Sequence, residues 1–357
     1  KHARAAEAHL LAIHAAADRV RTTSGAGQGG ALDEYAAILG EHLKLWPQGK
    51  TADQARWWLG NLYKSQRQWP EAIGEFRRVS PESDSFDPAV RAVAECYDAR
   101  LAELSREGKQ TDALADEAAR VFEGLVLGPA RQWPQTWTPT ARFAAVSAAR
   151  MRLRGPAQGY AHAERMLSAA LAAADDAPGE WQSEARSLLV FSLAAQGRRR
   201  EASAAMDQIS GGSLGGLLSM LEALARLTKQ AGPEVRGELA GLALRAVALV
   251  ESRKAELKGD NLRLFETARA EALAAAGKRA EAMAAYEELV QKYPRDGDVQ
   301  EAQAALLAAA NDAETLRRAL VQWQEVERKS RRGSERWYRA RYATAEIFYR
   351  LGENDKA

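Results

Sequence analysis

Cysteine is almost absent from this chain, which has only Cys96 among its 357 residues. A single cysteine excludes an internal disulfide and any zinc site built from several thiolates. It leaves the compartment open, because many secreted or periplasmic proteins also lack disulfides. Cys96 lies in the helix-like stretch "RAVAECYDARL", and we interpret it as a small residue that packs between helices.

An excess of charge and a long apolar run are also missing. The chain has 50 Lys and Arg against 48 Asp and Glu, a formal net charge of +2, so no strong field favours nucleic acid or an anionic membrane. No apolar run reaches the ~20 residues that a membrane helix needs, and no signal peptide is visible. We therefore expect no nucleic-acid partner and no direct membrane insertion.

Two basic runs, at 198–200 and 328–342, are candidates for binding nucleic acid. The second interleaves arginine with Trp337, Tyr338 and Tyr342, and single-strand binders also combine basic grooves with stacking aromatics. Acidic residues balance the run nearby, so we interpret both runs as solvated helix faces.

Motifs of catalysis are lacking too. The chain has no GxSxG, no phosphate loop and no GxGxxG after a strand. "SGAGQGG" lacks the Lys-Ser/Thr ending of a phosphate loop, and we interpret it as a turn. The five histidines do not form the metal pattern of two His at i, i+4 with a following Glu, and we interpret them as exposed helix residues. They are His2, His9, His14, His42 and His162. We predict a chain that is not an enzyme and has no cofactor and no metal.

Helix-forming residues dominate what is present. Hydrophobic residues make up 46% and charged residues 27% of the chain, a composition typical of an ordered protein. Alanine-rich stretches such as "YAHAERMLSAALAAADDA" contain strong helix formers. Apolar residues recur every three or four positions, as at Leu264, Ala268, Ala272 and Ala275. No run alternates in the manner of a strand, so the sequence predicts an all-α fold.

Short turns break these helical stretches at regular intervals. Eight turn residues extend from position 67 to position 352 with a mean spacing of about 41, which falls within the ~20–50 residue period of solenoid repeats. They are Arg67, Gly108, Gly155, Gly197, Gly232, Gly277, Asn311 and Gly352. Gly or Asn just past a helix takes the left-handed conformation that ends it. We predict about nine antiparallel helix hairpins, of which the ninth is incomplete.

A finer pattern of small and bulky residues repeats around some of these turns. It is clear at Leu59, Gly60, Tyr63, Ala72, Phe76 and Val79, and again at Ala270, Leu273, Gly277, Ala282, Tyr286, Leu289 and Pro294. It is partial at Val190, Leu193, Gly197, Ala202, Met206 and Ile209, and at Ala345, Phe348, Gly352 and Ala357. Small residues let two helices approach closely, while aromatics fill the space on the facing helix. The pattern resembles a tetratricopeptide repeat.

The resemblance implies a right-handed superhelical α-solenoid, with 1–357 as one continuous array. The clearest repeats are 51–81, 181–210, 263–294 and 334–357. Hairpins around 91–126, 138–175 and 213–257 keep only the helix-turn-helix outline and are equally read as generic α-solenoid units. Soft points are expected at 80–88, 128–138 and 209–216. We take the chain to be a fragment of a longer one, since it begins at Lys1 and stops inside a repeat, and we expect an exposed apolar stripe on its last helix.

In the family's register, the first helix of each hairpin lines a concave groove. The resemblance assigns to this groove Trp57, Asn61, Lys64, Glu184, Ser187, Phe191, Thr267, Glu271, Arg339, Tyr342, Glu346 and Tyr349. Trp58 falls on the packing side, and the alternative for Trp57 is packing on the neighbouring hairpin. Family members that grip a peptide's terminal carboxylate use Lys and Asn in the first repeat. Here Trp57 replaces the Lys, so a groove for a helix or an extended segment is favoured.

These features predict a protein–protein interaction scaffold that binds a partner peptide or domain in its groove. The alternative is a structural arm of a larger, membrane-coat-like protein that associates with copies of itself, through the incomplete last repeat. Stretches such as "EHLKLWPQGKTADQARWWLGNLYKSQRQWPEAI" look like bacterial tetratricopeptide proteins of the cell envelope. The compartment stays open between the bacterial periplasm or envelope and the cytoplasm. In the connection "RQWPQTWTP", Trp133 and Trp137 are expected to cover the edge of the solenoid.

Overall fold

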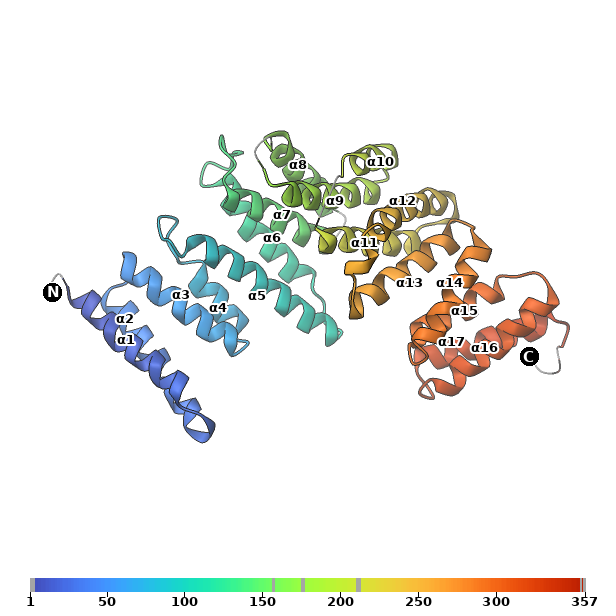
Figure 1. Cartoon of the computed structure of the whole chain (residues 1–357), viewed down its shortest axis with the longest axis horizontal. Helices are drawn as coiled ribbons and strands as arrows, with labels where there is room; N and C mark the ends of the chain where they lie inside the picture. Colours follow the sequence, from blue (N-terminus) through green and yellow to red (C-terminus); the bar gives the residue numbers. More distant parts are fainter. Residues whose placement is uncertain (1–3, 156–157, 175–176, 210–212, 354, 356–357) are drawn as a thin grey trace. The chain divides into compact units, whose positions relative to one another are not determined.

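The protein is helical throughout the part of the chain that its structure describes (Figure 1). This computed structural model describes residues 4–155, 158–174, 177–209, 213–353 and 355. Those residues form seventeen α-helices and two single 3₁₀ turns, at Gly25–Gly27 and Lys254–Glu256, and contain no strand. None of the described helices combines the length and hydropathy needed to cross a bilayer. The predicted all-α class is confirmed.

The described residues of the first compact unit, which extends from 1 to 175, form four helix pairs. In each pair the two helices follow one another in the chain and pack together. The pairs are α1 (Ala5–Thr22) with α2 (Gln28–Leu45), α3 (Lys50–Ser65) with α4 (Trp69–Phe76), α5 (Phe86–Arg106) with α6 (Asp112–Leu127), and α7 (Pro139–Arg154) with α8 (Gln158–Ala172).

The second compact unit, residues 176–357, contains four further pairs and a last single helix among its described residues. The pairs are α9 (Gly179–Ala195) with α10 (Arg199–Asp207), α11 (Leu214–Gln230) with α12 (Pro233–Glu251), α13 (Gly259–Ala275) with α14 (Arg279–Lys292), and α15 (Gly297–Ala308) with α16 (Ala313–Lys329). The last helix is α17 (Glu335–Arg350). Eight pairs and one single helix agree with the prediction of nine hairpins, the ninth incomplete.

The division into two compact units falls between residues 175 and 176. The sequence predicts one continuous array with soft points at 80–88, 128–138 and 209–216. The observed division lies at none of these three places. Residues 210–212 of the third lie outside the described part of the chain. We describe the two units separately.

Five of the eight predicted turn residues take the left-handed conformation. They are Arg67, Gly108, Gly197, Gly277 and Gly352, with φ between +58° and +78°. At each of these turns the N–H of the following residue donates a hydrogen bond of 2.9–3.0 Å to the carbonyl five residues earlier. This bond satisfies a carbonyl that the end of the helix would otherwise leave unpaired. The prediction is confirmed at these turns, including the one where arginine replaces glycine.

The prediction is wrong at the other three turn residues. Gly155 has φ −90° and Gly232 has φ −63°, both with extended ψ. Each precedes a proline in the sequence, and the proline ring restricts the residue before it to the extended region. Asn311 does not take a positive φ either. The next residue, Asp312, instead begins the following helix by accepting a hydrogen bond of 2.7 Å from the Thr315 N–H.

The hairpin of α3 and α4 shows how the small and bulky positions of the repeat fit together. Gly60 on α3 faces Phe76 on α4 so closely that an added Cβ would lie 2.6 Å from the phenyl ring. Phe76 is 2% exposed and Ala72 is fully buried. The same arrangement recurs in α13 and α14, where Ala270 and Tyr286 belong to one buried cluster. Close packing of these positions therefore matches their predicted roles.

Candidate functional site

The predicted groove positions on α3 are engaged within the first unit. The Trp57 ring lies against Phe76 of its own hairpin, with ring centroids 5.3 Å apart. Asn61 donates from Nδ2 to the Trp57 carbonyl at 2.7 Å, and Lys64 forms an ion pair with Glu95 on α5. Trp57 thus packs on its own hairpin, whereas the sequence alternative placed it on the neighbouring one. Trp58 packs on the α1–α3 cluster, as predicted.

The predicted positions on α9 lie inside the second unit. Phe191 is 4% exposed and Ser187 is 2% exposed, with its hydroxyl donating to the Ser183 carbonyl at 2.8 Å. The next first helix covers this part of α9, because a Cβ added to Gly216 of α11 would lie 3.6 Å from Glu184. Ser187 and Phe191 therefore do not offer their side chains to a partner, and Glu184 is half-buried.

The predicted positions on α17 are exposed. Tyr342 and Tyr349 are 73% and 71% exposed, and Glu346 is exposed beside them. Arg339 forms ion pairs with Glu301 at 2.6 Å and with Glu335 at 2.7 Å. This helix consequently presents an aromatic face with charged residues at its edge.

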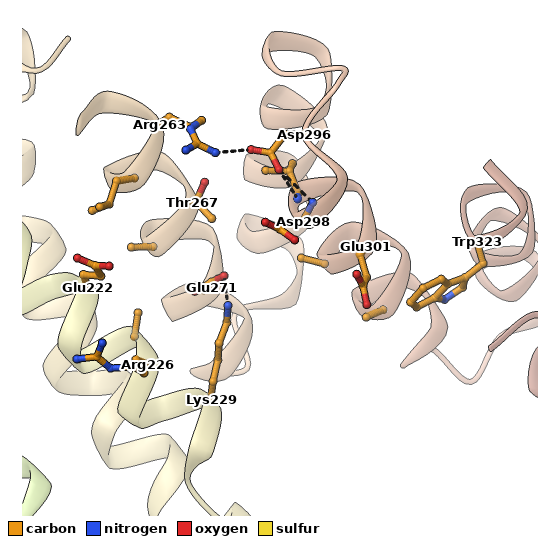
Figure 2. Close-up of a pocket in the computed structure, with 16 residues that line it drawn as sticks. Glu222, Arg226, Lys229, Arg263, Thr267, Glu271, Asp296, Asp298, Glu301 and Trp323 are labelled. Carbon is orange, nitrogen blue, oxygen red and sulfur yellow. Dashed lines mark hydrogen bonds and ion pairs between the residues drawn. The ribbon is translucent and has the colours of Figure 1, made fainter. Parts of the chain in front are cut away.

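Two predicted positions on α13, Thr267 and Glu271, line a cavity in the second unit (Figure 2). The cavity measures about 620 Å³ and lies between α11, α13 and α15, the first helices of three successive hairpins. Trp323 of α16 closes one side of it. A second cavity of about 420 Å³ adjoins the first, and seven of its lining residues are alanines. We name the second cavity the alanine cup, and the two together the unit-2 groove.

Five residues line both cavities and join them into one surface. They are Ala225, Lys229, Glu271, Ala302 and Ala305. The Lys229 ammonium pairs with the Glu271 carboxylate at 2.5 Å, and Figure 2 shows this bridge between α11 and α13. A bridge between the two helices sets the boundary between the larger cavity and the alanine cup.

A second ion pair holds the other end of the larger cavity. Arg263 of α13 lies 2.7 Å from the Asp296 carboxylate (Figure 2). Asp296 also caps α15, because its Oδ1 accepts hydrogen bonds from the Asp298 and Val299 N–H groups at 3.0 and 3.3 Å. Burial opposes ionisation of Asp296, but Arg263 and the backbone donors outweigh it and hold its pKa below the usual range. Asp296 therefore fixes the start of α15 and its spacing from α13.

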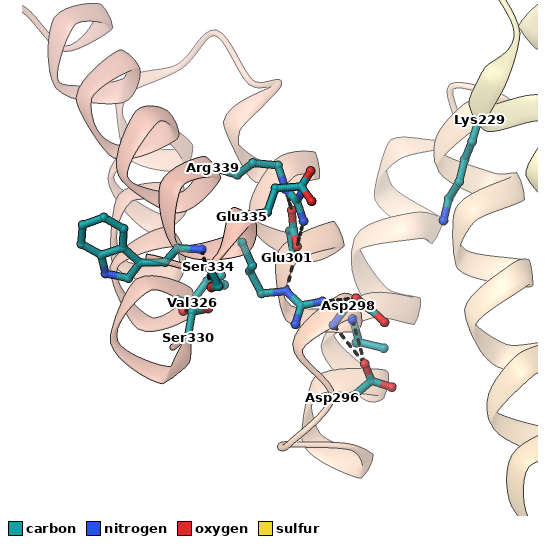
Figure 3. Close-up of polar contacts among 12 residues, drawn as sticks. Lys229, Asp296, Asp298, Glu301, Val326, Ser330, Ser334, Glu335 and Arg339 are labelled. Carbon is teal, nitrogen blue, oxygen red and sulfur yellow. Dashed lines mark hydrogen bonds and ion pairs between the residues drawn. The ribbon is translucent and has the colours of Figure 1, made fainter. Parts of the chain in front are cut away.

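The α15 wall of the groove is tied to α17 by a cluster of ion pairs (Figure 3). The Glu301 carboxylate accepts from Arg336 at 3.0 Å and from Arg339 at 2.6 Å, and Arg336 also pairs with Asp298. Burial raises the pKa of Glu301, but the two guanidiniums outweigh it and leave the pKa below its usual range. Glu301 therefore stays ionised near neutral pH, and the cluster of ion pairs orients α17 against α15.

The sequence reading missed the groove residues on α11 and α15, although a signal for them exists. The groove positions on α13, Thr267 and Glu271, stand ten and six residues before the turn residue Gly277. The same offsets from Gly232 and Asn311 yield Glu222 and Arg226 on α11, and Glu301 and Ala305 on α15. All six residues line the larger cavity. The repeat pattern is too degenerate in α11 and α15 to set the register. The positions of the turn residues alone are enough to locate the groove positions on these helices.

Two histidines, His42 and His9, differ from their predicted exposed positions, and the side chain of His9 is only 19% exposed. His42 on α2 is fully buried, with its Nδ1 3.3 Å from the Nδ1 of His9 on α1. Both rings contact Trp46, at centroid distances of 5.1 and 5.4 Å. The sequence interpretation followed from the lack of a metal-binding pattern, whereas the hairpin contact with α1 buries the ring. His14 and His162 are exposed, and His2 lies outside the described residues.

The remaining sequence candidates have packing or ion-pair roles. Burial raises the pKa of the Cys96 thiol to about 11, which agrees with a packing residue. Trp137 is buried and stacks on the 45% exposed Trp133, with centroids 6.3 Å apart. In the basic runs, Arg198 pairs with Glu201 and Arg328 with Glu325. Across the described ranges, no three His, Cys, Asp or Glu side chains gather as a metal site requires.

Comparison with known proteins identifies one repeat in the second unit. Residues 268–296 match the family model of the tetratricopeptide repeat, and they cover most of the predicted repeat 263–294. They contain the second half of α13 and all of α14. The tetratricopeptide resemblance is confirmed here, in the hairpin whose first helix forms the middle of the unit-2 groove. No curated protein matches the chain.

Two solved structures align with the chain over most of its length. The crystal structure of yeast Tom70 shares 11% identity over 96% of this chain and 89% of its own, with a TM-score of 0.28. The structure of the P58(IPK) TPR domain shares 13% identity over 99% of both chains, with a TM-score of 0.25. Both TM-scores are low, so the family model rather than either structure identifies the repeat.

Proposed function

We propose, from the tetratricopeptide repeat at residues 268–296, that this helical chain is a protein-interaction scaffold and that its unit-2 groove binds a segment of a partner protein. The observation that supports this most is the position of the groove. It is lined by equivalent positions of three successive first helices, α11, α13 and α15, and the middle one belongs to the matched repeat. Stacked hairpins create such a surface as a consequence of their repetition.

The chemistry of the groove also favours binding over catalysis. Its carboxylates at Glu271, Asp296 and Glu301 are held in ion pairs with cations of neighbouring helices. For two of them, Asp296 and Glu301, the pKa is lowered, whereas a general acid or base needs a pKa near the working pH. A groove of fixed charges around an apolar floor suits recognition of a peptide.

The proposed surface extends beyond the groove to other predicted positions. Tyr342 and Glu346 on α17 stand ten and six residues before Gly352, and α17 is tied to the groove wall through Arg339 and Glu301. We include them, together with Tyr349, in the proposed contact surface. On α3, Trp57, Asn61 and Lys64 remain proposed contacts of the first unit. On the sequence resemblance alone, we propose a bacterial assembly as the setting.

Photo-crosslinking from inside the groove tests this proposal. A photoreactive phenylalanine analogue replaces Thr267, which lines the groove, and in a matched variant it replaces Glu288, an exposed residue of α14 outside both cavities. In lysate of the source organism, we expect the Thr267 variant to capture a defined protein and the Glu288 variant not to. Equal capture from both positions, or none from Thr267, would contradict groove binding.

A structural arm that associates with copies of itself is the second candidate, and the α17 surface favours it. Tyr338, Tyr342 and Tyr349 are 61–73% exposed on this helix, and exposed apolar patches mark interaction surfaces. Sedimentation equilibrium over a concentration series tests it. Self-association that disappears in Tyr342→Glu/Tyr349→Glu would support the arm, and a monomer at every concentration would rule it out.

A further inference from the structure

The alanine cup is the most apolar part of the unit-2 groove. Six of its seven alanines come from α11, α13 and α15, the seventh, Ala309, directly follows α15, and Leu306 lies beside them. Alanine methyl groups fill little space between the helices, which leaves the volume of about 420 Å³ open. A dry cavity of ~150 Å³ already holds a benzene ring. The cup is therefore large enough for one bulky side chain together with part of the backbone that carries it.

The charges on the cup wall are not balanced. Glu271 is neutralised by Lys229 at 2.5 Å. Arg236 of α12 also lines the cup, and in the described chain its guanidinium bonds only the Ala231 carbonyl, at 2.9 Å. On α11, outside the cup, Arg226 and Glu222 both line the larger cavity, and neither has an ion-pair partner among the described residues. The charges of Arg226 and Glu222 offset each other, and Lys229 offsets Glu271, so Arg236 leaves the wall of the cup on the α12 side cationic.

A polar group also lies at the wall of the cup. Tyr286 of α14 is 3% exposed and lines the cup, and its hydroxyl has no hydrogen-bond partner within the described residues. Burial, with a smaller contribution from Glu271, raises its pKa, so the hydroxyl stays protonated. The hydroxyl oxygen is not among the fully buried unpaired atoms of the described residues, so it can be reached from the cup. It can donate to an acceptor that enters the cup.

We infer that the alanine cup is the anchor site of the groove, and that its occupant is a partner segment with one aromatic or large aliphatic side chain and an Asp or Glu within one helical turn of it. The apolar side chain fills the cup, as buried anchors of interfaces do. The carboxylate meets Arg236 on the cationic side, which is the charge complementarity that selects partners. This inference rests on the proposed function and specifies the class of segment bound.

Selection of peptides against the whole chain provides the test. A phage library of random peptides of about twelve residues, roughly three helical turns, is selected on the protein. Affinities of the enriched peptides are then measured for three variants. Ala305→Leu fills the cup from its exposed rim, Arg236→Glu reverses the charge of its wall, and Ala284→Leu is a matched control on an exposed face of α14 outside both cavities. Circular dichroism and the melting temperature confirm that each variant is folded.

We expect the enriched peptides to pair a bulky apolar residue with an acidic one three or four positions away. Their affinity should fall about tenfold or more in Ala305→Leu, the loss typical of a blocked anchor, fall in Arg236→Glu, and stay unchanged in Ala284→Leu. Peptides that depend on Ala305 but are basic or lack a bulky residue would overturn this inference while leaving groove binding in place. If no enriched peptide responds to Ala305→Leu, both the inference and binding in the groove fail.

Discussion

Arg67 shows that the turns of this chain keep a left-handed backbone conformation even where the residue is not glycine. Arg67 occupies the place that glycine has at four other turns, and its φ is +58°. A side chain in the left-handed region costs roughly 1–2 kcal/mol, so the turn geometry is maintained against this cost. Its ion pair with Glu103 at 3.7 Å is exposed and contributes little.

We therefore expect Arg67→Gly to be more stable than Arg67→Ala. Both variants lose the ion pair, but only alanine keeps the Cβ that is strained at positive φ, whereas glycine loses more entropy on folding. The net difference should be about 0.5–1 kcal/mol in favour of glycine. Urea unfolding of the two proteins measures it. An alanine variant that is equal or more stable would show that the turn is not strained.

A second residue-scale prediction concerns pH and the buried His42. Burial lowers its pKa from the ordinary 6.5, the charge of nearby His9 lowers it further, and a backbone group of Thr51 partly offsets both. The unfolded chain therefore takes up this proton more readily than the folded one. The contribution of uncharged His42 to the stability of the folded chain is complete above about pH 6.5, and it is lost as the pH falls through and below that value. We expect the α1–α2 hairpin to loosen in mild acid.

His42→Phe should remove most of this pH dependence, because phenylalanine keeps a ring in the core without a titrating group. Hydrogen exchange of α1 and α2 at about pH 7.5 and 5.5, the range in which histidine titrates, measures the effect. Correction for the intrinsic exchange rate is needed at each pH. His162→Phe, at an exposed position on α8, is the control and should retain the response. An identical response in both variants would assign the acid sensitivity to other groups.

At the scale of an element, two glycines in the same hairpin should respond in opposite ways to alanine. A Cβ added to Gly60 on α3 would lie 2.6 Å from the Phe76 ring. We therefore expect Gly60→Ala to destabilise the folded protein by about 1–3 kcal/mol. Gly74 on α4 has no atom within 4 Å of an added Cβ, so Gly74→Ala should stabilise by about 0.5–1 kcal/mol through helix propensity. Thermal melts of both variants decide this. Two shifts of the same sign would contradict close packing at Gly60.

At the scale of the whole molecule, the two compact units should respond separately to damage in a core. Leu221 is fully buried in a cluster that extends from α9 to α13, and truncation to alanine should cost about 2–5 kcal/mol. Because each hairpin packs mainly on its neighbours, we expect Leu221→Ala to increase hydrogen exchange in α9–α13 and not in α1–α8. Leu11→Ala, at a 71% exposed position, should change neither unit. A uniform increase across both units would mean that the chain unfolds as one body.

Much of the architecture could be read from the sequence because its causes are local. Helix-forming residues, apolar spacing and turn residues predict the helix pairs, and Gly197 and Gly277 take the conformation expected of them. The same local logic fails at Gly155 and Gly232, since the following proline has a stronger effect on their backbone than the position at the helix end. That neighbour is also visible in the sequence.

By itself, then, the sequence determined the helical class, the hairpins and the tetratricopeptide pattern predicted at residues 263–294, since helix formation and turn chemistry act over a few neighbouring residues. Only the tertiary structure decided which first-helix positions stay open. Ser187 and Thr267 stand at the same place in their repeats, yet Ser187 is buried while Thr267 lines the groove. The difference arises because the following hairpin covers α9 but leaves α13 accessible, and such contacts join residues that are far apart in the chain.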